Sequence, residues 1–339
     1  MTDLISRIEK LMEYETAGDP ITGLRWTCRT TEKIAMELIA EGIDICAVTV
    51  GKILKNLNYS LKVNSKKIAN GGKQLTPEER QKRNSQFEYI KFMRTENRVE
   101  NNPEISCDTK KKELIGNFKN SGTRYKKYAD LVYDHDFLTY CTGKAALYGI
   151  YDSLKNDGFV VIGKFLKEEK KNAFLSADTP EFAVEAIELW WLEKGIKQYS
   201  GDKLLILVDG GGSNGHRCHM WKVKIQEILC NKHNLEVTVC HYPPGASKWN
   251  PIEHRLFSEI SKNWKGTPLV DYETVYHYTK TTTTKTGLTV DAIMIDKQYK
   301  TGIKAEKKDI DNLNILRHEI NSSWNYTIFP QENMLQKAI

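Results

Sequence analysis

KLLILVDGGGSNG (residues 203–215) carries the clearest structural signal in the chain. The residues from Leu204 to Val208 are all apolar, which is typical of a strand buried on both faces of a sheet. Asp209 ends this strand before a glycine-rich segment, so its carboxylate should lie at the rim of the sheet, where open α/β sheets bind ligands. A carboxylate withdrawn from water must be paired, hydrogen-bonded or metal-bound. The pattern favours a functional site at Asp209; an acid in a surface loop is the alternative.

The neighbouring sequence predicts a mixed sheet flanked by helices. Strand-like runs precede the 203–209 segment, and an Asp-Gly turn at 155–158 joins the last two of them as a hairpin. These strands are expected at 105–108, 113–118, 131–137, 145–152 and 159–165. Helices are expected from Thr179 to Gly195, at 219–233 and from Asn250 onward, with another strand at 236–242. Antiparallel strands followed by alternating helices and strands indicate an α/β fold.

Two further acids stand at comparable positions. Asp108 ends the run at 105–108, and Glu253 falls in the first turn of the helix that Asn250 is expected to cap, with Pro251 at its first position. That helix carries a predicted buried stripe of Ile252, Leu256, Phe257, Ile260 and Trp264, with Glu253 at its edge. Asp108 as a turn residue, and Glu253 as an acid that only favours the helix dipole, are the alternatives.

Asp108, Asp209 and Glu253 together offer hard oxygen ligands, which suit Mg²⁺ or Mn²⁺ better than zinc. Two such ions about 3.5–4 Å apart can activate an attacking oxygen and stabilise a leaving oxygen in phosphoryl transfer. We therefore expect the three acids to be catalytic residues and metal ligands at once, with two ions bound.

The N-terminal part predicts DNA binding. Residues 27–62 predict short helices separated by Gly42, compatible with a helix-turn-helix or with a plain helical hairpin. Residues 51–98 contain twelve Lys or Arg and four Glu, a local net charge of +8, whereas the whole chain has +6. Such an excess indicates either a surface that binds a phosphate backbone or a solvated linker. Candidate DNA contacts in this part are Lys52, Lys55, Lys62, Lys66 and Lys67.

More candidate contacts adjoin the third acid. Lys248 and Arg255 could contact phosphate, with ordinary solvated charges as the alternative, and Trp249 could stack on a flipped base. Asn250 and His254 are possible accessory residues, and a packing role is an equal alternative for His254.

The remaining composition indicates a cytoplasmic globular protein. The first residues, MTDLISRIEKLMEYE, do not resemble a signal peptide, and no apolar run approaches the length of a membrane span. Seven scattered cysteines without a CxxC pair favour reduced thiols. Cys and His crowd one region of the sequence, but this set lacks the paired close ligands that a structural zinc site requires, so zinc is not expected there. The set consists of His216, Cys218, His219, Cys230, His233, Cys240 and His241.

Several long motifs resemble the Rhodopirellula-type DDE transposases of bacterial insertion sequences. The resemblance runs from GDPITGLRWT (18–27) almost to the C-terminus, and its strongest motif is YPPGASKWNPIEHRLFSEISKNWKG (242–266). Other matching segments are SCDTKKKELIGNFKN (106–120), DTPEFAVEAIELWW (178–191), LLILVDGGGSNG (204–215) and SSWNYTIFP (322–330). Members of this family usually carry more sequence before the GDP block, so one DNA-binding helical unit is expected to be missing here.

The resemblance implies a ribonuclease H-like fold with three antiparallel strands followed by parallel strands. Asp108 would lie on the first strand, Asp209 on the fourth and Glu253 on the helix after the fifth. The implied organisation is a helix-turn-helix region at 1–64, a basic linker and helix at 65–102, a catalytic domain at 103–266 and a C-terminal extension packed on it at 267–339.

The implied function is metal-dependent DNA cleavage and strand transfer. The partners would be element ends and target DNA, with a possible homodimer, and the location would be the bacterial nucleoid. A non-catalytic DNA-binding remnant and a nuclease that only hydrolyses are the competing interpretations. The three acids argue against the first, because a protein that only binds DNA does not need them.

Overall fold

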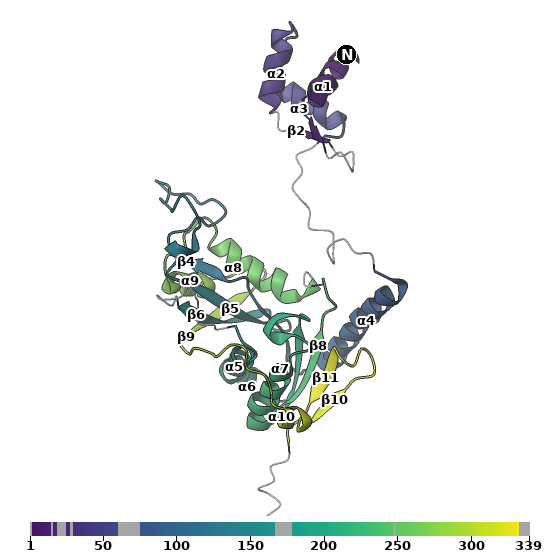
Figure 1. The fold of residues 1–339 in the computed structure, drawn as a ribbon, viewed down its shortest axis with the longest axis vertical. Coiled ribbons are helices and arrows are strands. Elements are labelled where there is room, and N and C mark those ends of the chain that lie inside the picture. The colour runs from purple at the N-terminus through teal and green to yellow at the C-terminus, as the bar shows by residue number, and fades with distance from the viewer. Residues whose placement is uncertain are drawn as a thin grey trace, which may run out of the picture. The chain divides into compact units, whose positions relative to one another are not determined.

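The computed structural model describes residues 2–14, 16–18, 25–27, 30–59, 75–166, 178–246 and 249–331. The chain divides into two compact units, Met1–Ile68 and Ala69–Ile339 (Figure 1). The finer division of the chain at residues 64, 102 and 266 stays a prediction.

The N-terminal unit contains three helices, α1 (Thr2–Tyr14), α2 (Thr31–Ala40) and α3 (Ala47–Asn56). A short antiparallel pair, β1 (Thr16–Gly18) with β2 (Arg25–Thr27), adds two strands to the helices that were expected. The Thr30 hydroxyl caps α2 by accepting a hydrogen bond from the Lys33 amide. Buried apolar residues of the three helices and of the connection between α2 and α3 form a small core: Ile8, Ile34, Ala35, Leu38, Ile45 and Val50. Both predicted helices are present, and their function as a helix-turn-helix stays a prediction.

The second unit is built on a nine-stranded mixed sheet. Its antiparallel part consists of β3 (Glu104–Thr109), β5 (Gly143–Asp152) and β6 (Asp157–Leu166), with the short β4 (Glu113–Ile115) paired to β5. On the other side of β3, the strands β7 (Lys203–Val208) and β8 (Glu236–His241) run parallel to it. Three strands from the C-terminal part complete the edges: β9 (Thr289–Ile295) beside β6, then β11 (Asn325–Ile328) and β10 (Ile315–Arg317) beside β8. The predicted ribonuclease H-like arrangement of antiparallel and parallel strands is confirmed.

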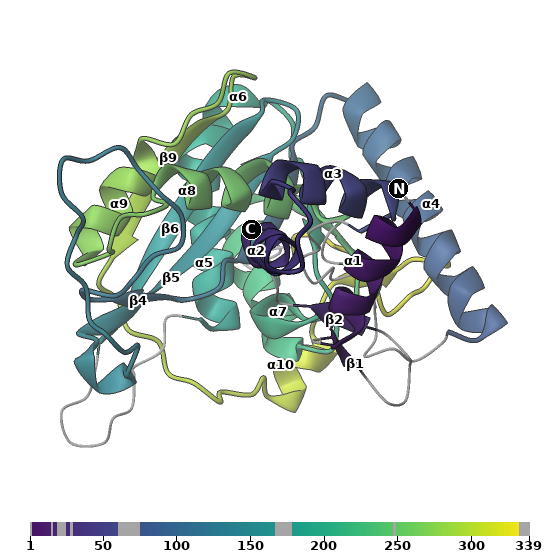
Figure 2. The ribbon, with the colours of Figure 1, turned by 90° about the horizontal axis from the view of Figure 1, so that it is seen from above.

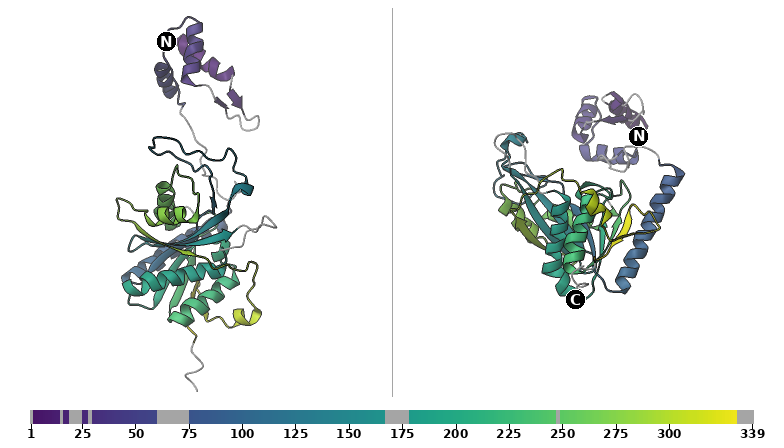
Figure 3. Two further views of the ribbon diagram at one scale, coloured as in Figure 1. Left: turned by 90° about the vertical axis from the view of Figure 1, so that its left-hand side faces the viewer. Right: turned by 60° about the horizontal axis from the view of Figure 1, so that its bottom comes forward.

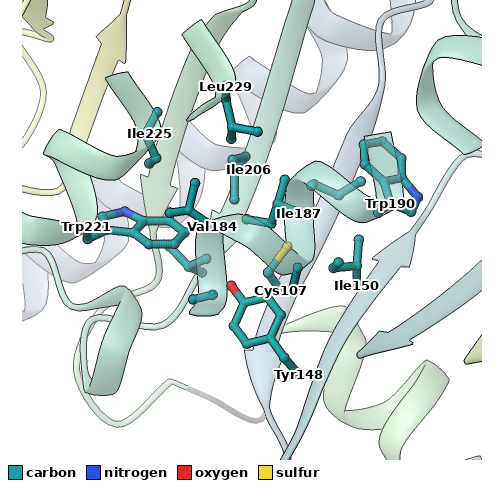
Figure 4. Close-up of a cluster of buried hydrophobic side chains, with 14 of the residues drawn as sticks. Cys107, Tyr148, Ile150, Val184, Ile187, Trp190, Ile206, Trp221, Ile225 and Leu229 are labelled. Atoms are coloured by element: carbon teal, nitrogen blue, oxygen red, sulfur yellow. The ribbon is translucent and has the colours of Figure 1, made fainter. Parts of the chain in front are cut away.

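Helices cover both faces of this sheet, as the edge-on view of Figure 3 shows. One face packs against α5 (Pro180–Trp190) and α7 (His219–Lys224), which continue as π-helical segments at Trp191–Gly195 and Ile225–Asn231. A short α6 (Ile196–Gln198) follows the first of these. Figure 4 shows part of this core, where Trp190, Trp221 and Leu229 meet Ile150 and Ile206 of the sheet. The apolar faces of these helices provide the burial that stabilises the sheet.

The opposite face packs against the helix that carries Glu253 and against α9 (Tyr272–Lys280). The Glu253 helix consists of a π-helical segment, Glu253–Phe257, and α8 (Ser258–Asn263). Its predicted stripe is confirmed, since the following side chains are all buried: Ile252, Leu256, Phe257, Ile260 and Trp264. In Figure 2, α8 and α9 lie over the region of β5, β6 and β9.

The long helix α4 (Pro77–Val99) is anchored to the sheet by buried polar contacts. A capping box formed by Thr76 and Glu79 starts the helix. The Gln86 amide, fully buried, donates hydrogen bonds to the His241 carbonyl at 2.9 Å and to the Asn325 side chain at 2.7 Å. Arg94 also pairs with the buried Glu104 of β3 at 2.8 Å. This predicted basic helix is therefore an integral part of the second unit.

The structure differs from the sequence predictions at several places. Residues 131–137 form no strand, because Leu131, Tyr133 and Phe137 remain exposed in a loop that leads to a short 3₁₀ turn, Leu138–Tyr140. The hairpin turn lies at 153–156, since Asp157 already pairs with Asp152. The C-terminal strands, and the short helix α10 (Lys307–Asp311) before β10, were not expected.

No helix in the described ranges is both long and apolar enough to cross a membrane.

Candidate active site

Asp108 and Asp209 lie side by side because their strands are parallel neighbours in the sheet. Cys107 of β3 is in register with Val208 of β7, and each is followed directly by one of the two acids. The flanking residues of both strands are buried, so the backbone at this edge is held firmly. The local pattern of an apolar strand ending in an acid has therefore produced a pair of carboxylates at one rim of the sheet.

The two carboxylates repel each other in a partly desolvated environment. Burial and the neighbouring charge of Asp209 raise the pKa of Asp108 to about 7, and the charges of Glu253 and Asp178 act in the same direction. Burial and the charge of Glu253 also raise the pKa of Asp209, against a hydrogen bond from Asn250 that lowers it. The three predicted acids are therefore electrostatic neighbours, joined by Asp178 as a fourth.

Asn250 orients Asp209 by a hydrogen bond from its side chain. Its Nδ2 donates to Asp209 Oδ1 at 3.2 Å, and its Oδ1 accepts a hydrogen bond from the hydroxyl of Ser106. Asn250 has no exposed surface, so these contacts fix the direction of its amide. The Ser106 hydroxyl in turn accepts a hydrogen bond from the Ile252 amide at 3.3 Å.

This arrangement corrects the prediction that the Asn250 side chain caps its own helix. The amide of Asn250 is occupied by Asp209 and Ser106, and the capping acceptor comes from β3, 146 residues away from Ile252. A residue preceding a Pro at the start of a helix is normally a cap whose side-chain oxygen accepts a backbone N–H. Here that oxygen, Asn250 Oδ1, accepts from the Ser106 hydroxyl instead.

A second buried network holds the backbone of Asp209. His241 Nδ1 lies 3.1 Å from the Asp209 carbonyl oxygen, and its Nε2 lies 3.2 Å from the Tyr326 hydroxyl. Trp221 Nε1 donates to the same hydroxyl at 3.1 Å. Burial lowers the pKa of His241 to about 3, so its ring is neutral and donates through Nδ1 to the carbonyl. The chain Trp221–Tyr326–His241–Asp209 thus links three elements to the strand end.

Glu253 begins a π-helical segment, a local widening of the helix that frequently occurs at functional sites. Gly149 of β5 lets this helix approach the sheet closely, since a Cβ at that position would lie 2.8 Å from Phe257 Cζ and 3.0 Å from Ile252 Cδ1. Across the described part of the chain, no group of three or more His, Cys, Asp or Glu side chains is arranged so that it could hold a metal ion. The acids influence one another electrostatically, and their oxygens are the donor type that Mg²⁺ and Mn²⁺ require, but the side chains are not gathered into a ligand set.

A cavity of about 570 Å³ opens in front of Asp108 and Asp209. Its wall includes the glycine-rich segment after β7, the turn Pro243–Gly245, and three consecutive lysines that follow β3, Lys110, Lys111 and Lys112. Asp178 also lines it, with its carboxylate 3.0 Å from Lys112 Nζ. Acids at the base of the cavity and lysines on its wall suit a phosphate group bound next to cations.

Sequence reasoning missed Asp178 and the lysines of the wall as site residues. Both belong to matched motifs, SCDTKKKELIGNFKN and DTPEF, but no local pattern separates a wall residue from a solvated charge. The roles of Ser106 and Tyr326 depend on contacts across the fold.

The remaining predicted DNA contacts are distributed over both units. Lys52 and Lys55 are exposed on α3 of the N-terminal unit. Arg255 and His254 are exposed on the Glu253 helix, and Trp249 is 57% exposed with its ring 6.0 Å from that of Phe87. Four predicted contacts lie outside the described residues: Lys62, Lys66, Lys67 and Lys248.

Known proteins similar to this chain include several DNA transposase complexes. The Mos1 transposase paired-end complex with left transposon end shares 14% identity over 81% of this chain and 69% of that chain, with a TM-score of 0.42. Mos1 mariner paired-end complexes with Mg and with Mn each share 12% identity over the same fractions, with TM-scores of 0.44 and 0.40. No curated protein sequence matches the chain. The sequence model described as the Rhodopirellula transposase DDE domain matches residues 7–330, nearly the whole length, and the chain therefore belongs to that DDE transposase family.

Proposed function

We propose that this chain cleaves DNA at the ends of an insertion sequence and joins the freed ends to target DNA, using Mg²⁺ or Mn²⁺. The observation that carries the proposal is the pair Asp108 and Asp209 on adjacent parallel strands, partly buried and opening onto one cavity. Membership of a DDE transposase family supports the same reaction class.

The cation-binding residues of the proposal are Asp108, Asp209 and Glu253. Bound there, two divalent cations would neutralise the carboxylates, activate the attacking oxygen and stabilise the leaving oxygen. Burial and neighbouring acids raise the pKa of Asp108 to about 7, so its charged form is destabilised unless a cation neutralises it. The proposal requires Glu253 to turn toward the aspartates when cations bind, and the π-helical turn at its position provides backbone freedom for that adjustment.

The other residues of the site bind and orient the substrate in this proposal. Lys110, Lys111 and Lys112 hold the phosphates that flank the scissile bond, and Asn250 keeps Asp209 Oδ1 directed by its hydrogen bond of 3.2 Å. Water attacks first and releases a 3′-hydroxyl; that hydroxyl then attacks target DNA. Both steps are in-line displacements at phosphorus without a covalent protein intermediate.

Recognition of the element ends is assigned to the N-terminal unit. Its α3 carries the exposed Lys52 and Lys55, and the predicted contacts Lys62, Lys66 and Lys67 follow in the sequence. Trp249, Arg255, His254 and Lys248 are proposed to contact DNA beside the acids. A homodimer that holds two ends at once is part of the proposal.

The test uses the full chain and a duplex that carries the DNA flanking its own coding sequence. We expect strand cleavage with Mg²⁺ or Mn²⁺, no cleavage in excess EDTA, and no cleavage by Asp209→Ala, which removes one proposed ligand. Asp311→Ala is the matched control and should cleave normally, because Asp311 is an exposed acid of α10 that does not line the cavity. Cleavage that persists in EDTA, or in Asp209→Ala, would contradict the proposal.

A strand-transfer assay separates the two competing functions. Joined products between the cleaved 3′ end and a supercoiled target plasmid are expected from a transposase. Cleavage without joined products would identify a nuclease of the same fold. Salt-sensitive DNA binding without any cleavage would identify a protein that only binds DNA.

A further inference from the structure

A second cavity of about 450 Å³ lies in the same unit and is lined by basic and aromatic residues. We call it the Trp324 pocket; its wall consists of Lys82, His216, Arg217, His219, Lys222, Pro244, Arg317, Ser323 and Trp324. These residues come from α4, the segment before α7, α7 itself, the turn after β8, β10 and the turn before β11. None of the nine is acidic, although the whole chain contains 44 Asp and Glu.

The positive charges of this pocket are not neutralised within the described residues. No ion pair there involves the four cationic residues Lys82, Arg217, Lys222 or Arg317, whereas many other lysines of the same unit are paired, for example Lys194 with Asp157 and Asp291. This positive charge also acts on His216. Burial and the charges of Arg217, Lys222 and Lys82 lower the pKa of His216, whereas its hydrogen bond with the Gly210 carbonyl raises it. A concentration of like charges costs free energy unless an anion binds.

Lys222 is the most unusual member, because it is a buried lysine without an acidic partner. Only 2% of its surface is exposed, and its Nζ donates a hydrogen bond to the His216 carbonyl at 2.6 Å. Burial and the charge of Arg317 lower the pKa of Lys222 to about 8. Buried lysines are normally paired with an acid, which offsets the cost of removing the charge from water. For Lys222 no acid in the described part of the chain offsets this cost.

The aromatic wall makes the pocket rigid. Lys82 Nζ lies 4.8 Å from the centre of the Trp324 ring, and the Trp324 carbonyl accepts a hydrogen bond from the His241 amide at 2.9 Å. Lys222 Nζ also lies 5.2 Å from the ring of Tyr326. Both ammonium groups are thus held by aromatic faces, with cation–π attraction in place of an ion pair.

The Trp324 pocket adjoins the candidate active site. Pro244 lines both cavities, and His216 Nδ1 lies 3.1 Å from the carbonyl of Gly210, which is next to Asp209. The two cavities are therefore close enough for one nucleic-acid strand to contact both.

We propose that the Trp324 pocket binds a backbone phosphate of the DNA strand whose neighbouring phosphodiester lies at Asp108 and Asp209. Lys82, Arg217, Lys222 and Arg317 neutralise this phosphate and fix the register of the strand. The inference rests on the proposed function for the identity of the substrate, and its binding test does not depend on cleavage.

The test compares two double variants of the full chain that lose the same charge. Lys82→Gln with Arg317→Gln removes two exposed cations of the pocket, and Lys300→Gln with Lys304→Gln removes two exposed lysines outside both cavities. All positions are exposed, so folding should be preserved, which circular dichroism verifies.

Binding of a fluorescent duplex is measured in EDTA over a series of salt concentrations. We expect about tenfold weaker binding by the pocket variant and a salt slope smaller by about 0.7–0.9, the value for one lost phosphate contact. The control variant should change affinity less than about twofold. A methylphosphonate scan then replaces single phosphates: one position should weaken the native protein and leave the pocket variant unchanged.

Equal affinities and slopes of the two double variants would overturn the inference. A second result would also overturn it: pyrophosphate stabilises the native protein but not the pocket variant, while the pocket variant binds DNA with native affinity. The pocket would then bind a free phosphate compound and not DNA. Reduced DNA binding of the pocket variant in a chain that never cleaves DNA would leave this inference standing and refute the proposed function instead.

Discussion

The hydrogen bonds that join Ser106, Asn250 and Asp209 allow a quantitative test of how the site is held. Ser106→Ala removes the hydroxyl that donates to Asn250 and accepts from the Ile252 amide, and so leaves two buried polar groups without their partner. One buried unsatisfied group costs about 1–3 kcal/mol, so we expect a loss of about 2–4 kcal/mol in the free energy of unfolding. Asn250→Ala removes the hydrogen bond to the Asp209 carboxylate and leaves a small cavity, for a loss of about 2–4 kcal/mol.

The double variant should be less destabilised than the sum of the single variants, by about 1–2 kcal/mol, because the Ser106–Asn250 bond can be lost only once. Urea unfolding in EDTA measures this coupling without a contribution from bound cations. Tryptophan fluorescence reports mainly on the second unit, since all tryptophans except Trp26 lie in Ala69–Ile339. Ser258→Ala is the matched control, because its hydroxyl donates only to the His254 carbonyl in the same helix. Additive effects of the two substitutions within about 0.3–0.5 kcal/mol would refute the proposed linkage.

Three further outcomes are expected from other contacts. Gly149→Ala places a methyl group against Phe257 and should cost about 1–3 kcal/mol in urea unfolding and lower DNA cleavage, because the Glu253 helix must shift; native activity would show that the helix position is not critical. Asp108→Asn removes like-charge repulsion and should raise the free energy of unfolding in EDTA by about 1–3 kcal/mol while abolishing cleavage; a destabilised variant would contradict the repulsion. Burial alone would raise the pKa of Glu104, but its hydrogen bonds with Arg94 and other donors lower it, so Glu104→Gln should cost about 3–5 kcal/mol at neutral pH. The folded-state pKa lies below the unfolded value, so the native advantage is complete above about pH 5 and disappears as the pH falls through the folded-state pKa; an advantage independent of pH would point to packing instead.

The parts of the fold that could be predicted from the sequence are those with strong local signals. Two patterns of apolar residues predicted burial directly. They are the uninterrupted apolar run before Asp209 and the apolar stripe of the helix that carries Glu253. The position of each acid at the end of its element followed from these runs. That Asp108 and Asp209 become neighbours also required the pairing of β3 with β7, which no local pattern contains.

The last two strands, β10 and β11, could not be predicted because their local patterns are weak. β10 has three residues, of which two are exposed, and β11 buries Asn325 and Thr327 together with Tyr326 and Ile328. The two buried polar residues are satisfied by partners far away in sequence: Asn325 by Gln86 and Thr327 by Thr238 and His318. Periodicity methods count such residues as exposed, so a strand with alternating polar and apolar residues is read as half solvated.

The supports of Asp209 explain why the segment beyond residue 266 belongs to the candidate site even though all three predicted catalytic acids precede it. The hydroxyl of Tyr326 bridges Trp221 and His241, and His241 in turn holds the Asp209 carbonyl. Without β11, the edge of β8 would lose its antiparallel partner, and two buried side chains would lose their hydrogen bonds. A carboxylate that must be kept partly buried beside two others experiences a steady repulsive force, so its backbone has to be fixed from several directions. β3 supplies one support through Ser106, the Glu253 helix a second through Asn250, and the C-terminal strand a third. The same C-terminal segment also provides Arg317 and Trp324 to the neighbouring basic pocket, which makes it a structural and electrostatic part of the site.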